Sequence, residues 1–432
     1  MNGDEIIKKQ DEFMLPATRE GRYPLVLVEG KGAILKDINR KEYIDCHGGY
    51  AVVTLGHCHP DVVKAIVEQT EKIWHVSWDF YLESTSLLAE RIAQVCPGKL
   101  KKTLFSNSGA EAVENAVKLA KKRAFTNGRE GTQIVSLNGS FHGRTSYAMS
   151  LTGQNKYKKG LSTFVNPNVV HAPAPYCYRC PFSMTYPECD LHCAKHLEHV
   201  IKYETSGDIA AFISEPIFGE GGIIVPPEPY LKEAVKIFKE YDAIYIADEV
   251  QTGFAKTGKL FGVEWYGVEP DVMTLAKGIA SGLPLAATVA TDEVSGSLTS
   301  IDHCATYGGN AVVCAAALEN INVMLRERLH KKALDLGKIF MEGFSKLEEK
   351  HSSIGEVRGK GLMIGVEIVK DKKSKVPDKA ECGRIRKKAM KKGVLVNSGG
   401  ILGNVLRVQP PLAISEEQTK KVIEILAYAF KP

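Results

Sequence analysis

The chain has 432 residues, of which 44% are apolar and 25% charged, and its formal net charge is +5. This composition excludes a disordered or low-complexity protein, and the densest basic run (384–392) fits a solvated helix face better than a nucleic-acid site. No apolar run approaches the roughly 18 residues of a membrane span, and the first residues lack the apolar core of a signal peptide. We therefore expect a cytoplasmic protein that binds neither membranes nor nucleic acids. A chain of this length is expected to fold as two or more domains.

Short apolar runs alternate with amphipathic stretches through the middle of the chain. This alternation is typical of β-α units around a mainly parallel sheet and predicts the α/β class. In such sheets ligands bind outside the carboxyl ends of the strands, where several of these runs end in a polar residue or a small-residue turn. The runs expected to form strands are 25–28, 33–36, 103–105, 210–213, 244–247, 272–276 and 285–289.

The last hundred residues have a different pattern. A charged helix is expected over 325–350, and a final helix over 416–430. Strand candidates at 362–369 and 405–408 lie between them and flank the basic helix. This order predicts a smaller α+β domain. The expected parts are an N-terminal segment (1–50) that packs with the small domain, a large domain (51–320) and a C-terminal small domain (321–432).

Three polar sites follow predicted strands. Ser108, Gly109 and Ala110 open a helix, where free N–H groups bind phosphate, although an N-cap in a tight turn explains the same residues. Asp248 ends a buried run and needs a partner such as a pyridinium nitrogen, unless it only caps a loop. Lys277 ends another run, where lost hydration lowers the pKa of its amine, unless it is a solvated loop lysine. An anion site, an acid and an amine together are what pyridoxal phosphate (PLP) requires.

The chain also resembles the class III (subgroup II, ornithine/4-aminobutyrate type) aminotransferases, which are PLP enzymes of fold type I. The resemblance extends in family order over nearly the whole chain. The matching stretches are GHCHPDVVKAI (56–66), FSNSGAEAVENAVKLA (105–120), SFHGRT (140–145), SEPIFGEGG (214–222), IADEVQTGFAKTGKLF (246–261), PDVMTLAKGIASGLP (270–284), TYGGNAVVCAAAL (306–318), VRGKGLMIGVEI (357–368) and LRVQPPL (406–412).

The resemblance implies how the cofactor is held. Lys277 would form a Schiff base with the PLP aldehyde, and Asp248 would keep the ring nitrogen protonated so that the ring accepts electrons. Gln251 would approach the phenolic oxygen, Phe141 would stack on the ring, and residues 108–110 would hold the phosphate. The reaction would alternate between an amino donor and a 2-oxo acid, with ping-pong kinetics.

Further residues are implied for the substrate and for the partner subunit. Arg407 would bind a substrate carboxylate, and Glu220 would pair with Arg407 when the substrate lacks that carboxylate. Arg144 would be a second carboxylate contact, because the planar guanidinium matches carboxylate geometry. Thr306 would reach the phosphate of a neighbouring subunit's cofactor, so the active unit would be a homodimer or homotetramer. Tyr50 matches the tyrosine of ornithine aminotransferases that contacts the α-carboxylate.

The substrate and even the reaction type stay open at this point. Tyr50 favours an ornithine-type donor over 4-aminobutyrate, whereas Phe218 replaces the glutamine usual in ornithine enzymes. The stretch that starts at Val357 also matches alanine–glyoxylate enzymes. Some relatives with these motifs are amino-acid racemases, which need the same lysine and electron sink. A non-catalytic protein of the same fold is a further alternative, but Lys277 and Asp248 are both retained.

A cysteine cluster departs from the family pattern. Its spacing is Cys177-x2-Cys180-x8-Cys189-x3-Cys193. Four thiolates so spaced suit a structural zinc ion, and an iron–sulfur cluster is an alternative. The same cysteines could instead be reduced thiols or disulfides, or the centre of a redox or metal-sensing module. We expect no metal in the catalytic site, because amino transfer needs none.

Overall fold

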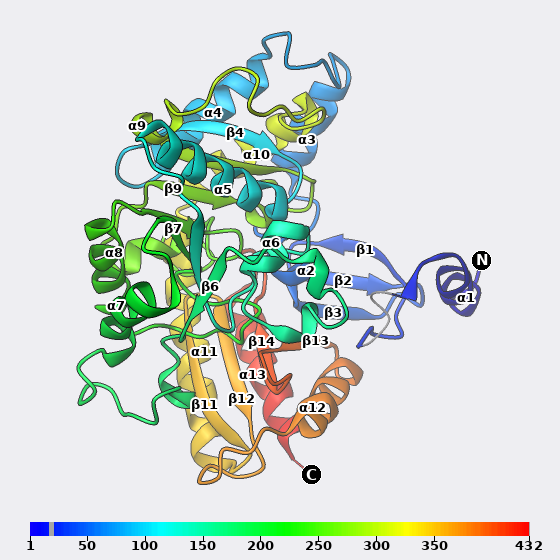
Figure 1. Cartoon of the computed structure of the whole chain (residues 1–432). Coiled ribbons are helices and arrows are strands. Elements are labelled where there is room, and N and C mark those ends of the chain that lie inside the picture. The colour runs from blue at the N-terminus through cyan, green and yellow to red at the C-terminus, as the bar shows by residue number, and fades with distance from the viewer. Residues whose placement is uncertain (17–20, 432) are drawn as a thin grey trace.

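Two seven-stranded sheets organise the chain in the computed structural model, which describes residues 1–16 and 21–431 (Figure 1). We call the sheet built from residues 100–291 the larger sheet and the other the smaller sheet, after the sizes of the two domains expected from the sequence. The larger sheet has the order β4-β10-β9-β8-β7-β5-β6. β10 is antiparallel to both of its neighbours, and β9, β8, β7, β5 and β6 pair in parallel. This sheet confirms the predicted α/β class. Its strands are β4 (Leu100–Ser106), β5 (Gln133–Leu137), β6 (Val169–Ala172), β7 (Ile209–Ser214), β8 (Ile244–Asp248), β9 (Val272–Leu275) and β10 (Ala286–Thr291).

Helices cover both faces of the larger sheet, and successive residues of a strand are therefore buried on opposite sides. In β7, Ala211 and Ile213 pack in one apolar cluster with α5 (Gly109–Thr126). Phe212, which lies between them in sequence, packs in another cluster with α7 (His192–Glu204) and α8 (Tyr230–Glu240). Burial on both faces explains why these strands are continuous apolar runs in the sequence.

The smaller sheet combines strands from both ends of the chain, in the order β1-β2-β3-β13-β14-β12-β11. β3 (Glu42–Cys46) pairs in parallel with β13 (Val394–Gly399). From this pairing we propose that 1–50 and 321–432 form one domain and 51–320 the other. The other strands are β1 (Leu27–Lys31), β2 (Ile34–Asp37), β11 (Ile354–Lys360), β12 (Met363–Ile368) and β14 (Val405–Val408).

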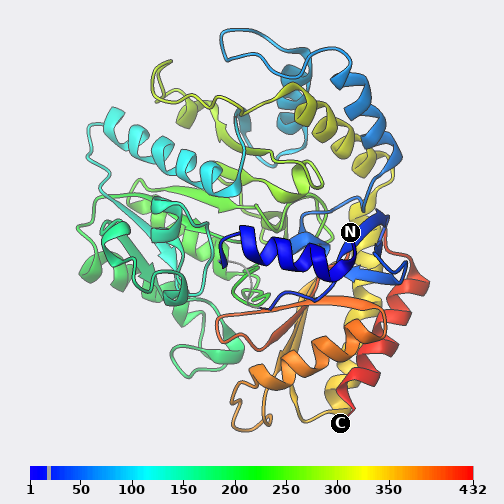
Figure 2. The ribbon, with the colours of Figure 1, turned by 90° about the vertical axis from the view of Figure 1, so that its right-hand side faces the viewer.

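The remaining helices surround the two sheets. α11 (Leu329–Lys350) and α12 (Lys379–Lys391) pack against the smaller sheet, and α13 (Glu416–Phe430) packs against these two helices (Figure 1). None of the residues of α1 (Gly3–Phe13) is buried, and Figure 2 shows this helix on the surface. Within residues 1–16 and 21–431, no helix is long and apolar enough to cross a membrane. The other helices are α2 (Gly48–Ala51), α3 (Pro60–Thr70), α4 (Glu83–Val95), α6 (Ser146–Leu151), α9 (Asp292–Ser295) and α10 (Ala311–Arg326).

The structure corrects one helix and adds several strands. The helix expected over 325–350 forms as α11 but begins only at Leu329, because residues 325 and 326 are the end of α10. Arg328 between them has a left-handed φ of 51°, which no helix continues through. The sequence patterns also do not predict β3, β5, β6, β11 and β13, whose short apolar stretches are interrupted by polar residues or glycine.

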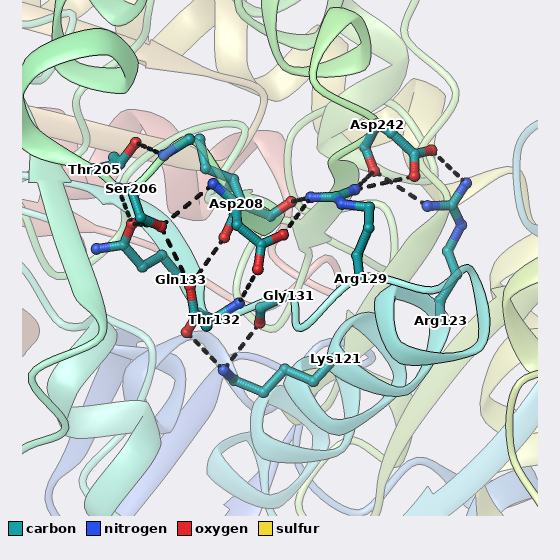
Figure 3. A network of polar contacts seen from close by, with 12 residues as sticks. Lys121, Arg123, Arg129, Gly131, Thr132, Gln133, Thr205, Ser206, Asp208 and Asp242 are labelled. Carbon is teal, nitrogen blue, oxygen red and sulfur yellow. Dashed lines mark hydrogen bonds and ion pairs between the residues drawn. The ribbon is translucent and has the colours of Figure 1, made fainter.

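A polar network holds the C-terminal end of α5 (Figure 3). Arg123 Nη2 donates to Asp242 Oδ1 at 2.8 Å, and Arg129 bridges Asp242 and Asp208 with contacts of 3.0 Å to each. These aspartates precede β8 and β7, so the arginines tie the end of α5 to the start of two strands. The opposite end of α5, at Gly109, therefore lies at the carboxyl edge of the sheet.

Candidate active site

The carboxyl edge of the larger sheet gathers polar side chains from adjacent strands. Asp248 is the last residue of β8, and Glu215 directly follows β7. Lys277 comes two residues after β9, and β9 is the parallel neighbour of β8. Because parallel strands end at the same edge, the structure brings these three side chains together.

A cavity of about 380 Å³ opens at this edge. Its size suits a small cofactor together with part of a substrate. Four of the residues proposed from the sequence, Arg144, Thr306, Tyr50 and Arg407, lie outside its lining. The proposed residues that line it are Ser108, Gly109, Ala110, Phe141, Glu220, Asp248, Gln251 and Lys277.

Asp248 is held by three donors. Its Oδ2 lies 2.7 Å from His142 Nδ1. Its Oδ1 accepts hydrogen bonds from the N–H of Val250 and from the hydroxyl of Thr274, both at 3.1 Å. Each carboxylate oxygen can accept more than one hydrogen bond, so Asp248 keeps capacity for a ligand while its orientation is fixed.

Lys277 combines unusual backbone geometry with a dehydrated amine. Its φ is 46°, in a region that residues other than glycine rarely adopt and that is common at functional sites. The half-buried side chain lines the cavity, and desolvation lowers the pKa of its amine, although the nearby Asp248 carboxylate opposes the shift. A lysine with a lowered pKa has more of the neutral, nucleophilic amine at a given pH.

An arginine–glutamate ion pair adjoins the cavity, which Glu220 lines. Arg407 Nη1 donates to Glu220 Oε2 at 2.6 Å. The Arg407 side chain is only 1% exposed, and its Nε has no partner among the described residues. Burial opposes ionisation of Glu220, but Arg407 and Tyr157 outweigh it and lower the pKa of this carboxyl. Tyr50 is exposed, and its ring centroid lies 5.9 Å from the Arg407 guanidinium.

Two other proposed residues lie further out. The exposed Arg144 places its guanidinium carbon 4.4 Å from the ring centroid of Tyr157. Thr306 is exposed on the loop between α9 and α10 and takes no part in the cavity of its own chain.

Comparison with known proteins identifies the family. The family model described as Aminotransferase class-III matches residues 16–430. The chain belongs to the class-III aminotransferases. The acetylornithine aminotransferase of Methanosarcina mazei is 40% identical over 430 residues, which cover 99% of this chain and 96% of that protein. The leucine/methionine racemase of Thermococcus litoralis is 38% identical, with coverage of 99% and 96%.

A solved structure confirms the fold and the cofactor class. An amine transaminase from an uncultivated Pseudomonas species, in its PLP-bound form, matches with a TM-score of 0.90 and 31% identity, over 97% of this chain and 98% of that one. Class-III aminotransferases depend on PLP, so PLP is the cofactor of this aminotransferase.

The start of α5 could hold the phosphate of PLP. Ser108 is the N-cap of this helix, and its Oγ accepts a hydrogen bond from the N–H of Glu111 at 3.3 Å. The N–H groups of Gly109 and Ala110 have no partner within the helix, so they remain available to an anion. A β-carbon at Gly109 would lie 2.9 Å from Val250, so glycine keeps this approach open. The capping and the phosphate-binding interpretations are therefore compatible.

Glu215 and Gly219 fix the positions of Phe141 and Gln251 beside the cavity. Glu215 accepts hydrogen bonds from the N–H of Phe141 at 2.9 Å and of Gly219 at 2.7 Å. Burial raises the pKa of Glu215 to about 7. A β-carbon at Gly219 would lie 2.0 Å from Gln251 Oε1, so glycine at this position is required for the observed place of Gln251.

Three residues around the cavity carry no role from the sequence. His142 directly follows Phe141, and its position in the matching stretch SFHGRT is the sequence signal that could have placed it in the site. Thr274 lies within β9 and Tyr157 in a short 3-10 helix (Asn155–Tyr157). Thr274 falls within the matching stretch 270–284 but carries no implied role there, and Tyr157 lies in none of the stretches, so only the packing of distant segments reveals their contacts with Asp248 and Glu220.

The four clustered cysteines line one hollow, which is formed mainly by residues 174–193. All four are free thiols. Burial, and to a smaller extent the negative charge of neighbouring cysteines, raises the pKa of Cys193 to about 12. Across residues 1–16 and 21–431, no group of three or more His, Cys, Asp or Glu side chains is placed to hold a metal ion. This geometry does not support the zinc or iron–sulfur hypothesis, and metal analysis of the purified protein tests it directly.

Proposed function

We propose that this aminotransferase moves an amino group from a donor whose reacting amine lies far from any α-carboxylate, such as ornithine or 4-aminobutyrate, to a 2-oxo acid such as 2-oxoglutarate or pyruvate. The ion pair of Glu220 and Arg407 is the observation that carries the proposal. While Glu220 neutralises Arg407, the cavity beside Lys277 suits a chain that presents an amine without a neighbouring carboxylate. Tyr50, beside Arg407, supports an ornithine-type donor with a distant carboxylate.

The same arginine would serve the second substrate. When the ion pair with Glu220 opens, the guanidinium of Arg407 offers its planar donors to the carboxylate next to the carbonyl of the 2-oxo acid. Arg407 Nε, which has no partner among the described residues, adds a donor for this carboxylate. Arg144, which is exposed beside the ring of Tyr157, would be the second carboxylate contact.

The residues of the cavity divide the chemistry between them. PLP, when bound, withdraws electrons from the carbon that bears the reacting amine. Lys277 Nζ, whose pKa is lowered by desolvation, accepts the proton of that carbon and returns it. The Asp248 carboxylate, fixed by His142 and Thr274, favours a protonated ring nitrogen. Gln251 and Phe141 orient the ring, and the turn at 108–110 holds the phosphate.

Racemisation is the second candidate function, favoured by the similarity to the Thermococcus litoralis enzyme. A racemase would use the same Lys277 and Asp248, but would return the proton to the opposite face of the same substrate.

Isotope transfer separates the two candidates. The holoprotein is incubated with ω-nitrogen-15 ornithine or labelled 4-aminobutyrate and 2-oxoglutarate, and glutamate is analysed by mass spectrometry. Labelled glutamate is the expected result. If glutamate stays unlabelled while an L-amino acid loses its optical activity, the racemase replaces the transaminase as the function.

The pH dependence of cofactor capture tests the role of Lys277. Only the neutral amine reacts with an aldehyde, so capture of PLP by the apoprotein should accelerate as pH rises through the pKa of Lys277. The Asp248 carboxylate raises this pKa and Arg407 lowers it. Asp248→Asn is therefore expected to lower the pH at which the capture rate is half-maximal, and Arg407→Gln is expected to raise it. Stopped-flow absorbance measures both, with Arg326→Gln as a remote control; two unchanged midpoints would count against Lys277 as the captured amine.

We also propose a cytoplasmic homodimer or homotetramer. Thr306 supports this assembly, because it is exposed and lies outside the cavity of its own chain, as expected of a residue that contacts a neighbouring subunit's cofactor. Analytical ultracentrifugation of the holoprotein measures the assembly.

A further inference from the structure

Tyr157 lies where the proposed substrate switch and the ring-stacking residue meet. Its hydroxyl donates to Glu220 Oε1 at 2.9 Å, while Arg407 donates to the other oxygen of Glu220 at 2.6 Å. The two oxygens of this one carboxylate are thus held by two different groups. Tyr157 is half-buried, and burial together with the charge of Glu220 raises the pKa of its phenol, so the hydroxyl stays protonated and remains a donor.

The ring of Tyr157 is held independently of its hydroxyl. Phe141 meets it edge-on, with centroids 5.3 Å apart and an interplanar angle of 71°. The guanidinium of Arg144 lies 4.4 Å from the ring centroid and the amine of Lys156 4.9 Å. Lys156 is itself anchored by donating to the carbonyl of Gly400 at 3.2 Å. Cations over an aromatic face and an edge-on neighbour fix a ring in place, so the hydroxyl is aimed at Glu220 before any substrate arrives.

The hydroxyl matters most when Arg407 leaves. With Arg407 paired, Glu220 has an ionic partner as well as Tyr157. When a carboxylate takes Arg407, the ionised Glu220 stays in a site where its side chain is only 19% exposed. A largely buried charge without a partner is costly, so losing the last hydrogen bond costs more than losing one of two. Tyr157 therefore stabilises the released state of Glu220 more than the paired state.

We propose that Tyr157 is a positioning residue that determines access of the 2-oxo acid to Arg407, by holding Glu220 after the ion pair opens. This inference rests on the proposed function, because it assumes that Arg407 alternates between Glu220 and a substrate carboxylate. It assigns a role in substrate specificity to a side chain that need not touch the cofactor.

Two substitutions separate the hydroxyl from the ring. Tyr157→Phe removes the hydrogen bond to Glu220 and keeps the ring contacts, whereas Tyr157→Leu removes both. For Tyr157→Phe we expect the KM for 2-oxoglutarate to rise about tenfold or more, the loss typical of a hydrogen bond to a charged group. The half-reaction with an ω-amine donor, in which Glu220 stays paired with Arg407, should change less than about threefold. Tyr203→Phe, at an exposed tyrosine on α7, is the matched control.

A binding measurement and a double mutant complete the test. Glutarate has the two carboxylates of 2-oxoglutarate but no carbonyl, so calorimetry with the holoprotein measures carboxylate binding without turnover. Its Kd should weaken about tenfold in Tyr157→Phe. In a Glu220→Gln background, Tyr157→Phe should add little, because the charge that the hydroxyl stabilises is gone.

The outcomes distinguish this inference from the function on which it rests. If the wild type transaminates but Tyr157→Phe affects both half-reactions equally, or neither, the inference is wrong and the proposed function stands. If only Tyr157→Leu has an effect, the ring acts and the hydroxyl does not, which also overturns the inference. If the wild type transfers no amino group from any donor, the function and the inference fail together.

Discussion

Replacing Lys277 with alanine is expected to lower the turnover of the holoprotein by at least about a thousandfold. Lys277 is the amine at the carboxyl edge of β8 and β9, and its pKa is lowered by desolvation. A positioned general base alone contributes about 10²–10⁴-fold, and the nucleophile is lost as well. Steady-state amino transfer measures the effect. Small primary amines added to the solution should restore part of the rate, because they fit the space of the missing side chain.

A matched control and a second readout make this test specific. Lys338→Ala removes an exposed lysine that pairs with Asp335 and should leave turnover unchanged. Borohydride reduction of the wild-type holoprotein, followed by peptide mass mapping, should place the cofactor adduct on Lys277. An adduct on another lysine, or turnover within tenfold of wild type in Lys277→Ala, would disprove the assignment.

Asp248→Asn is expected to lower turnover about a hundred- to a thousandfold, the range found when one preorganised electrostatic group in an active site is removed. The neutral amide cannot favour a protonated ring nitrogen. It also disturbs the local network, because its NH2 group would face a donor, either His142 Nδ1 or the Val250 N–H and Thr274 hydroxyl pair. Single-turnover kinetics with PLP at saturation measures the chemical step apart from cofactor loss.

Thr274→Val is the companion variant. It removes one donor to Asp248 and keeps the shape of the side chain and the carboxylate charge. We expect a loss of about tenfold or less, because Val250 and His142 still hold Asp248. If Thr274→Val were as damaging as Asp248→Asn, orientation and not charge would be the main contribution of this aspartate. An Asp248→Asn protein with normal single-turnover rates would remove Asp248 from the mechanism.

Much of the fold could be predicted from the sequence because strands buried on both faces leave a local record. The runs at 244–247 and 272–276 are continuous and apolar, and β8 and β9 form there. The final helix, α13, has the bounds expected from its periodicity. The break between α10 and α11 could not be predicted, because a single left-handed residue at Arg328 interrupts a pattern that remains periodic on both sides.

The sequence by itself determined the family, because the matching motifs extend in family order over nearly the whole chain. It also determined the α/β class and the residues at the strand ends, because Lys277, Asp248 and the turn at 108–110 follow directly from where apolar runs stop. Only the tertiary structure decided what surrounds them. His142 is 106 residues from Asp248, and Tyr157 is 63 residues from Glu220, and each pair meets through the packing of separate segments. The pairing of β3 with β13 likewise joins the two ends of the chain. Such contacts depend on how distant elements pack, and no periodicity within a short segment records them.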